Sequence, residues 1–465
     1  MAIISNKKQL SVLLVTTLSS FLTPFMGSAV NVALPAIARE LSLTALALSW
    51  VATSFILTAA ITLIPLGRLA DIYGRRRMFI YGAMIFTVAS SFCILSPTQS
   101  FLIAARAIQG IGGAMIFSTG TAMLISAFPP GERGRILGIN ITAVYIGLTI
   151  GPFIGGMLTQ YLGWRYIFLF TVFLGAAIVY ITLSKIESEG SAHEDEGFDL
   201  TGSVIYAIAL FSIMFGFSEL PSLNAAFLIG TGILFLILFV FQQIKSPFPL
   251  VDINLFIKNK VFAFSNLAAL INYSATFVIN FLLSLYLQNI KTLTPAEAGS
   301  ILIAAPAVQA FISPFAGRLS DRFEPQIISS IGMLMTVFGL ILLIFLNGAT
   351  SNHYVLFCLI LLGVGFALFS SPNVNATMSS VETKYYGVAS ATLGTMRLTG
   401  QMFSMGITML VFAVILGNHP ISLENHHLFL KSTKLIFSIL SVLCFAGIFA
   451  SLARGKMHNG NNNHR

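Results

Sequence analysis

Long apolar stretches, separated by short polar ones, run along almost the whole chain of 465 residues. A helix needs about 20 mostly apolar residues to cross the hydrocarbon core of a bilayer, and fourteen stretches are long enough. We therefore predict spanning helices at residues 10–32, 48–66, 78–96, 101–127, 136–160, 165–184, 200–218, 224–242, 261–287, 296–316, 326–347, 353–378, 386–416 and 432–453. The pattern predicts an all-α integral membrane protein.

The composition agrees with a membrane protein. Hydrophobic residues make up 56% of the chain and charged residues only 9%, which is too apolar for an ordinary soluble domain. The first stretch is too long for a removable signal peptide and is poor in small residues where cleavage would occur. Cys93, Cys358 and Cys444 lie inside apolar stretches without CxxC spacing, so we expect them to be packing residues.

The distribution of basic residues predicts the orientation. With a cytoplasmic N-terminus, eighteen Lys and Arg residues fall on the cytoplasmic side and five on the other, while Arg106 and Arg397 fall inside spans. Basic residues collect in cytoplasmic loops, so both termini are predicted to be cytoplasmic. The formal charge of +9 therefore reflects membrane topology, and nucleic acid is not an expected partner. We interpret the acidic segment 184–199 as a solvated linker, with a regulatory site as the alternative.

Two short motifs recur at nearly one offset. GRLAD at 67–71 returns as GRLSD at 317–321, and GIGGAM at 110–115 is echoed by GVGFAL at 363–368. Such repetition predicts two similar halves, an arrangement common in transporters. The offset exceeds six helices by about two, so the helices at 200–218 and 224–242 read as an insertion. The predicted parts are a six-helix bundle, a linker with two inserted helices, a second six-helix bundle and a disordered cytoplasmic tail, at residues 1–184, 185–248, 249–453 and 454–465.

Several motifs resemble those of the major facilitator superfamily. Three of them are similar to its loop, fourth-helix and fifth-helix motifs: GRLADIYGRRR at 67–77, RAIQGIGGA at 106–114 and GLTIGPFIGG at 147–156. Three more resemble its fourteen-helix drug:proton antiporter branch: GWRYIF at 163–168, FDLTG at 198–202 and PLVDINLF at 249–256. The resemblance implies two six-helix bundles plus two inserted helices, working by alternating access.

The repeated GRLxD loops are candidates for a conformational latch. Their glycines permit tight turns, and their aspartates can cap a helix or pair with a basic neighbour. The resemblance implies a latch that is made and broken as the halves move, with a plain topology anchor as the alternative. The residues concerned are Gly67, Arg68, Asp71, Gly74, Arg75, Glu132, Arg133, Gly317, Arg318 and Asp321.

The fifth span carries small residues at helix-packing spacing. Gly147, Gly151, Gly155 and Gly156 allow a neighbouring helix to approach closely, and Pro152 frees a backbone carbonyl and bends the helix. Close packing against a neighbour is the plain interpretation. The resemblance adds that this packing sets the direction in which an exporter opens.

The first span departs from the family pattern. FMGSAVNVALP at 25–35 has Met26 where the resemblance implies an aspartate for proton handling and cation recognition. All sixteen acidic residues fall in loops or at helix ends, and the seven histidines fall in loops, tails or at a span edge. Neither proton coupling nor a preference for cations is therefore supported by the residues.

Neutral polar residues and two arginines remain to line a cavity. The candidates are Met26, Asn31, Arg106, Gln109, Tyr145, Asn272, Tyr273, Asn280, Gln309, Arg397 and Gln401, with Asn140, Asn373 and Asn375 in neighbouring positions. Any of the neutral ones could instead serve in hydrogen bonds between helices. A buried arginine is costly in a membrane, so Arg106 either snorkels to the outer surface or is met by carbonyls, Gln109 and an electron-rich substrate. Such a cavity suits a neutral or anionic amphipathic molecule better than a cation.

These observations predict a secondary transporter in the cell membrane, a multidrug-type exporter of small amphipathic molecules. The alternatives are a facilitator or importer of an anionic or neutral metabolite, and a non-transporting receptor or scaffold. An enzyme is disfavoured because the sequence has no nucleophile–base arrangement, metal-ligand spacing or phosphate-binding loop. We expect no cofactor and no metal. The expected partners are membrane lipid and a small-molecule substrate, with protons left open, and a monomer is expected.

Overall fold

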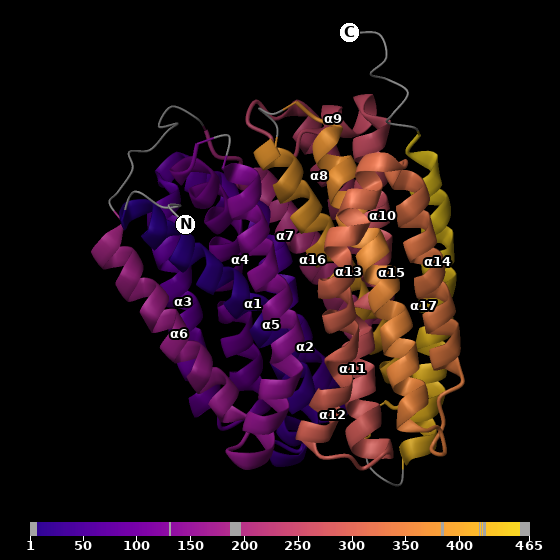
Figure 1. Cartoon of the computed structure of the whole chain (residues 1–465). Helices are drawn as coiled ribbons and strands as arrows, with labels where there is room; N and C mark the ends of the chain where they lie inside the picture. The colour runs from indigo at the N-terminus through magenta and orange to yellow at the C-terminus, as the bar shows by residue number, and fades with distance from the viewer. Residues whose placement is uncertain are drawn as a thin grey trace.

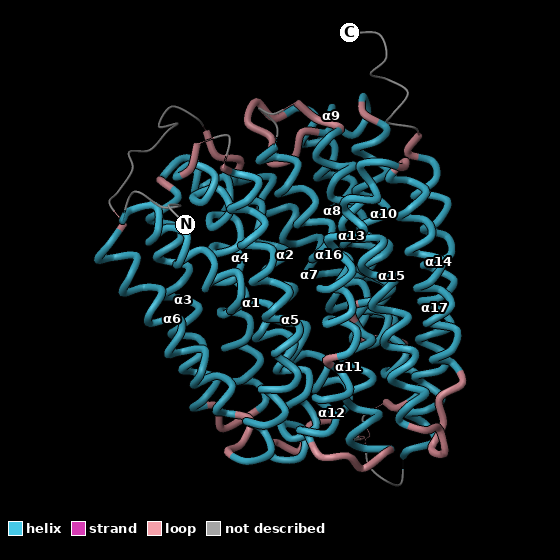
Figure 2. The backbone as a smooth tube through the Cα atoms, viewed as in Figure 1, coloured by secondary structure: helices cyan, strands magenta, loops and turns pink. Residues whose placement is uncertain are grey.

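The computed structural model of the protein describes residues 7–129, 132–186, 197–382, 386–417, 419, 421 and 425–455. These residues form helices joined by loops, with no strand among them. Fourteen helices or helix pairs are long and apolar enough to cross a membrane, which confirms the predicted all-α membrane fold. Figure 1 shows them standing side by side, with the N-terminal half on one side and the C-terminal half on the other, and Figure 2 shows the loops gathered at two opposite ends.

The helices form two groups of six spans with a pair between them. The first group is α1 (Lys7–Glu40), α2 (Ala45–Tyr73), α3 (Arg75–Leu95), α4 (Gln99–Ala127), α5 (Arg133–Tyr161) and α6 (Arg165–Lys185). The inserted pair is α7 (Leu200–Ser218) and α8 (Leu223–Lys245). The second group is α9 (Ile253–Lys258), α10 (Lys260–Thr276), α11 (Val278–Leu285), η1 (Tyr286–Ile290), α12 (Pro295–Leu302), α13 (Ala304–Arg322), α14 (Pro325–Ile344), α15 (Asn352–Ser379), α16 (Tyr386–Ile415) and α17 (His426–Ala453).

Two of the predicted spans are interrupted rather than continuous. In the span over 260–290, α10 ends before α11, and the N–H of Val278 donates to Ser404 Oγ of α16 at 3.2 Å. In the span over 295–322, α12 ends before α13, and Pro306 has no N–H to donate to the Leu302 carbonyl one turn earlier. Both breaks leave backbone groups inside protein rather than against lipid, as a membrane requires.

The sequence repeat corresponds to equivalent helix crossings. In the first half Gly110 of α4 lies against the backbone of Phe55 in α2 so closely that a Cβ would collide with it. In the second half a Cβ on Gly363 of α15 would lie 2.6 Å from the Ala305 carbonyl of α13. Each glycine lets two helix backbones touch, and the pairs are offset by about 250 residues.

A second crossing repeats in the same way. A Cβ on Gly112 of α4 would lie 2.7 Å from the Gly82 carbonyl of α3, and one on Gly365 of α15 would lie 2.9 Å from the Gly332 carbonyl of α14. The glycines shared by GIGGAM and GVGFAL therefore mark backbone contacts that both halves need.

The inserted pair lies beside the place where the halves meet. Helix α7 packs against α8 and contacts both α2 and α16. Its Phe215 ring lies 6.3 Å from the Trp50 ring of α2, and Phe217 packs on Gly406 of α16. Helix α8 is mostly exposed, as expected for a helix that faces lipid. The residue bounds predicted for the separate parts stay predictions.

Candidate transport pathway

Three glycines of α5 bring this helix into backbone contact with α1. A Cβ on Gly147 would lie 2.5 Å from the Phe21 carbonyl oxygen, and one on Gly155 would lie 2.7 Å from Ala29 Cα. Between them, Gly151 faces Ser28 with no room for a side chain. The spacing of four residues keeps all three glycines on one face of α5, so α1 and α5 form a tight pair inside the first half.

The fourth glycine of the motif faces the other half of the molecule. Gly156 of α5 lies against the backbone of Pro295 in α12, and Gly299 of α12 lies against the carbonyl of Pro152 in α5. In both cases a Cβ would overlap the opposing backbone. We call this reciprocal pair the outer contact, because it lies toward the ends of the helices opposite the basic loops.

Hydrogen bonds join the halves at the same level. The N–H of Ala296 in α12 donates to Gln160 Oε1 of α5 at 3.2 Å. Gln288 of η1 donates through Nε2 to the Val32 carbonyl of α1 at 2.8 Å. The two halves are therefore closely joined near their predicted outer ends.

A second set of residues joins the halves near mid-depth. Ser313 of α13 donates to the Tyr145 hydroxyl of α5 at 3.3 Å, and the guanidinium of Arg397 in α16 lies 4.7 Å from the centroid of the Phe117 ring in α4. Tyr273 of α10 packs on Gly400 of α16, one turn from Arg397. We call Tyr145, Ser313, Arg397, Phe117 and Tyr273 the central cluster.

The cation in the central cluster has unused donor capacity. Nε of Arg397 is buried and has no hydrogen-bond partner within the described residues. Nearby on α13, Gln309 approaches Ser370 only at 3.5 Å, at the limit of a hydrogen bond. An arginine with a free N–H between two halves of a membrane protein is suited to meet an acceptor on a bound molecule.

The chain matches one protein family over most of its length. A family model described as Major Facilitator Superfamily matches residues 16–405 and, in an overlapping second match, residues 265–462. The chain belongs to the Major Facilitator Superfamily. With fourteen spanning helices it is a multi-pass cell membrane protein.

Similar superfamily proteins carry transporter names. The riboflavin transporter RibZ of Clostridioides difficile (strain 630) is 26% identical over 447 residues, which cover 96% of this chain and 97% of RibZ. Multidrug resistance protein Stp of Mycobacterium tuberculosis (strain CDC 1551 / Oshkosh) is 31% identical over 427 residues, covering 90% of this chain and 78% of Stp. A bacterial homologue of the human lysosomal transporter Spinster, solved in an inward-facing, occupied conformation, aligns with a TM-score of 0.71 and 16% identity over 98% of this chain and 99% of that one.

In this superfamily member Arg106 is enclosed by α2, α3 and α4. Arg106 is only 2% exposed. Its Nε donates to the Val51 carbonyl at 3.2 Å, and a terminal nitrogen donates to Gln109 Oε1 at 2.5 Å. Gln109 in turn donates to Ser90 Oγ at 2.7 Å, and the guanidinium lies 4.7 Å from the Phe55 ring centroid. One backbone carbonyl, the Gln109 amide and the Phe55 ring therefore offset the charge, and the guanidinium does not snorkel.

We expect Arg106→Gln to destabilise the first half of the molecule. The substitution leaves the buried Val51 carbonyl and Gln109 amide short of a donor, which costs about 1–3 kcal/mol. Thermal unfolding in detergent should show a lower melting temperature, and Arg106→Lys should restore it only in part because Lys lacks the planar fork. An unchanged melting temperature in Arg106→Gln would contradict this role.

The remaining cavity candidates are distributed more widely. Met26, Asn31, Gln109 and Asn272 are buried, and Asn280, Gln309 and Gln401 are half-buried. The flanking asparagines bond between helices: Asn140 to the Thr16 carbonyl, Asn373 to the Ser265 carbonyl and Asn375 to Ser320 Oγ. The buried candidates could line a cavity only in another conformation of the protein. The assignment of the buried and the half-buried candidates to a substrate cavity therefore stays a prediction.

The latch residues lie where α2 and α13 end at the basic face. Asp71 and Arg75 form an exposed ion pair at 2.9 Å, and Gly74 between α2 and α3 has a φ of 101° that favours glycine. In the second copy the Asp321 carboxylate accepts from Asn375 at 3.2 Å.

The two glycines that open the loops face equivalent neighbours. Gly67 lies against Ser118 of α4 and Gly317 against Ser371 of α15, each followed by its arginine, Arg68 or Arg318. Glu132 is exposed at the start of α5, and the side chain of Arg133 lies outside the described residues. Contact between the latch residues and Glu132 or Arg133 stays a prediction.

We expect Asp71→Asn to slow transport without unfolding the protein. The Asp71–Arg75 pair is exposed, and such i,i+4 pairs contribute only about 0.3–0.5 kcal/mol to stability. Expression and melting temperature should stay close to wild type while turnover in vesicles falls. Wild-type turnover at normal expression would reduce the loop to a topology anchor.

Some residues that organise the pathway carry no signal in the sequence. Phe117 is one of 41 phenylalanines, and only the fold brings it to Arg397. At the outer end, Glu40 of α1 binds Arg165 and accepts from Trp164 Nε1 at 2.6 Å, while Arg165 Nε donates to the Ile94 carbonyl at 3.0 Å. Through these contacts Trp164 and Arg165 of the GWRYIF segment join α6 to α1 and α3.

The end of α17 holds a further buried cation, which the sequence pattern does not distinguish from the other basic residues at the cytoplasmic face. Arg454 is 1% exposed and donates to the carbonyl and hydroxyl of Ser451 at 2.8 and 2.6 Å. Ser330 of α14 also donates to the Ser451 hydroxyl, at 2.9 Å. Burial lowers the pKa of the Arg454 guanidinium to about 10, so it stays charged at neutral pH. A terminal nitrogen of Arg454 also donates to Ser265 Oγ of α10 at 3.5 Å, while the Ser330–Ser451 bond links α17 to α14.

Proposed function

We propose that the protein exports small amphipathic molecules, neutral or anionic, from the cell by alternating access, and that it is not an enzyme. The observation that carries the proposal is the central cluster, in which Arg397 of one half stacks on Phe117 of the other. A molecule bound there touches both halves at once. Binding can therefore bias their relative arrangement, which a transporter requires.

The outer contact supports the alternating part of the mechanism. In the outer contact, two glycines let the backbones of α5 and α12 touch. Water is excluded where the backbones touch. No glycine side chain has to rearrange when the two helices separate. In the state described here the halves are joined at that level. Export then requires the outer contact to separate after the substrate has entered from the cytoplasmic side.

The charge of the pathway supports the substrate class. In the described part of the chain every carboxylate lies in a loop or at a helix end, whereas Arg397 lies near the middle of α16. A cation at mid-depth would meet Arg397 without a compensating acid, whereas an anion or a neutral acceptor would be stabilised. Phe117 and the two tyrosines favour an aromatic portion.

An importer of a neutral metabolite is a second candidate. Its substrate class, but not its direction, is favoured by the similarity over nearly the full length of both chains to RibZ, whose name gives riboflavin as its substrate. Riboflavin is neutral, aromatic and rich in acceptors, so it suits the same cluster. The direction of transport distinguishes the two candidates.

A ligand-stabilisation screen of the purified protein tests the substrate class. The probes are salicylate as an aromatic anion, riboflavin as a neutral aromatic and ethidium as an aromatic cation. We expect the first two classes to raise the melting temperature in wild type, because a ligand bound only to the folded state stabilises it. Stabilisation by ethidium alone would overturn the assignment of the central cluster.

We expect an imposed pH gradient alone to drive no accumulation of substrate. With the membrane potential clamped, uphill transport would need a group that binds a proton on one side and releases it on the other. Met26 replaces the first-helix acid and is buried in the core. Uphill uptake into reconstituted vesicles under a pH gradient would show that another proton carrier exists.

A further inference from the structure

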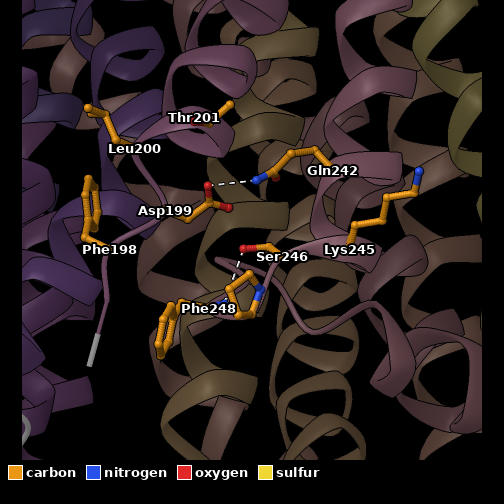
Figure 3. A pocket seen from close by; sticks show the side chains of 9 residues that line it. Phe198, Asp199, Leu200, Thr201, Gln242, Lys245, Ser246 and Phe248 are labelled. Atoms are coloured by element: carbon orange, nitrogen blue, oxygen red, sulfur yellow. Dashed lines mark hydrogen bonds between the residues drawn. The ribbon is translucent and has the colours of Figure 1, made fainter. Parts of the chain in front are cut away.

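A separate pocket lies at the ends of the inserted helices, away from the central cluster. It has a volume of about 410 Å³ and is formed by the start of α7, the end of α8 and the loop that follows. Its walls include Phe198, Asp199, Gln242, Lys245 and Phe248 (Figure 3). The size suits a small polar group.

The pocket is built around a buried carboxylate. Asp199 is 8% exposed and accepts hydrogen bonds from the Gly202 N–H at 2.8 Å, Gln242 Nε2 at 2.8 Å and Gln243 Nε2 at 2.7 Å. All three donors are neutral, and Asp199 takes part in no ion pair within the described part of the chain. Among the residues that the structure describes, its negative charge is held in place by neutral donors alone.

The arrangement of this carboxylate is fixed by its surroundings. A Cβ on Gly202 would lie 2.5 Å from Gln243 Nε2, so glycine at this position lets the amide lie close to the start of α7. Gln243 also accepts from the Val251 N–H at 3.0 Å, which ties α8 to the following loop. A Cβ on Gly197 would lie 2.6 Å from the Phe248 ring. The carboxylate and one aromatic wall are thus preformed.

The chemistry of the walls favours an ammonium group beside a phosphate. Figure 3 shows the rings of Phe198 and Phe248 on one side of Asp199 and the Lys245 side chain on the other, beyond Gln242. A carboxylate with aromatic faces nearby attracts an ammonium ion. Lys245, with the hydroxyls of Thr201 and Ser246, offers a cation and donors to an anion.

The position of the pocket points to lipid as the source. It lies at the same end of α7 and α8 as the linker predicted to be cytoplasmic, at the level of the lipid headgroups. Leu200 in its wall is 65% exposed, and Phe241, which precedes Gln242 in α8, is 61% exposed, so apolar surface continues from the pocket along the membrane. Acyl chains can lie on that surface while the headgroup enters the pocket.

We propose that this pocket binds the headgroup of phosphatidylethanolamine from the cytoplasmic leaflet, with the ammonium at Asp199 between the phenylalanines and the phosphate at Lys245. Binding there stabilises the junction between the inserted pair and the second half. The site does not depend on the substrate proposed above and would exist whatever the protein transports.

Native mass spectrometry of the purified full chain with defined lipids tests the proposal. We expect wild type to retain phosphatidylethanolamine about tenfold better than phosphatidylglycerol of the same acyl composition, which is about 1.4 kcal/mol in binding. Asp199→Asn should abolish this preference, since asparagine keeps the oxygen that caps α7 and accepts from Gln242, but loses the charge and the oxygen that accepts from Gln243. Lys185→Gln, which removes an exposed cation at the equivalent end of α6, should leave the preference intact.

Several results would overturn the proposal. Equal retention of both lipids by wild type, or an unchanged preference in Asp199→Asn at wild-type melting temperature, would exclude the headgroup site. Soluble glycerophosphoethanolamine serves as a second probe. If it protects the protein from heat as well as the lipid does, the pocket binds a free metabolite and the lipid assignment is wrong. If Asp199→Asn unfolds, Phe248→Leu, which removes an aromatic wall at the exposed rim, replaces it.

Discussion

Gly299→Ala is expected to prevent the outer contact from closing and to reduce transport at least about tenfold, which corresponds to about 1.4 kcal/mol. The new Cβ would overlap the Pro152 carbonyl of the opposite half. A backbone carbonyl cannot move aside as a flexible side chain can, so the two helices must separate. The outer contact lies between the two halves and not in the core of either half. Each half should therefore fold normally in this variant. Gly156→Ala meets Pro295 in the same way and should behave alike.

The matched control is Gly138→Ala, on the same helix as Gly156, where a Cβ would meet nothing within 4 Å. Double electron–electron resonance between spin labels at Tyr161 and Ala349 reports the opening, in a background without the three buried cysteines. Gly299→Ala should shift the distance distribution to longer values, and Gly138→Ala should match wild type. If both variants match wild type, the reciprocal glycines do not form the outer gate.

Arg397→Gln is expected to weaken binding of aromatic anions at least about tenfold, since a charge-assisted hydrogen bond contributes about 1.5–3 kcal/mol. Nε of Arg397 is buried without a partner within the described residues, and the guanidinium is held over the Phe117 ring. Removing the charge should remove the preference for salicylate over ethidium in the stabilisation screen. Phe117→Leu keeps the charge and should retain part of the affinity for anions.

The control for Arg397 is Arg135→Gln, which removes one exposed positive charge near the start of α5. It lowers the net charge of the protein by the same amount but lies far from mid-depth. We expect it to bind salicylate as wild type does. Equal loss of binding in Arg135→Gln and Arg397→Gln would mean that overall charge, not the central cluster, selects anions.

The spanning helices could be predicted because their signal is local. An apolar stretch must be about 20 residues long to cross a bilayer whatever surrounds it, so the count of fourteen needed no tertiary information. The breaks in the ninth and tenth spans could not be predicted in the same way. The first involves Ser404, which is 126 residues from Val278 in the chain and reaches it only through the packing of α16 on α10.

A residue of the candidate site could be predicted from the sequence only where its own side chain is unusual for its surroundings. An arginine in an apolar span is conspicuous, so Arg106 and Arg397 were found, and so was Gln109 one turn from Arg106. Their different surroundings were not: Arg106 is enclosed by its own half, whereas Arg397 reaches across to Phe117. Gly299 was missed because its partner, Pro152, lies 147 residues earlier and nothing in the surrounding letters pairs them.

The most direct test of the account is transport by the purified protein in reconstituted vesicles with equal pH on both sides. The probes are fluorescein, an aromatic anion, and ethidium, an aromatic cation, each supplied as a concentration gradient. We predict saturable movement of fluorescein that is lost in Gly299→Ala and strongly reduced in Arg397→Gln, with no protein-dependent movement of ethidium. Movement of ethidium but not fluorescein, or fluorescein transport that survives both substitutions, would contradict an alternating-access carrier of neutral and anionic amphiphiles.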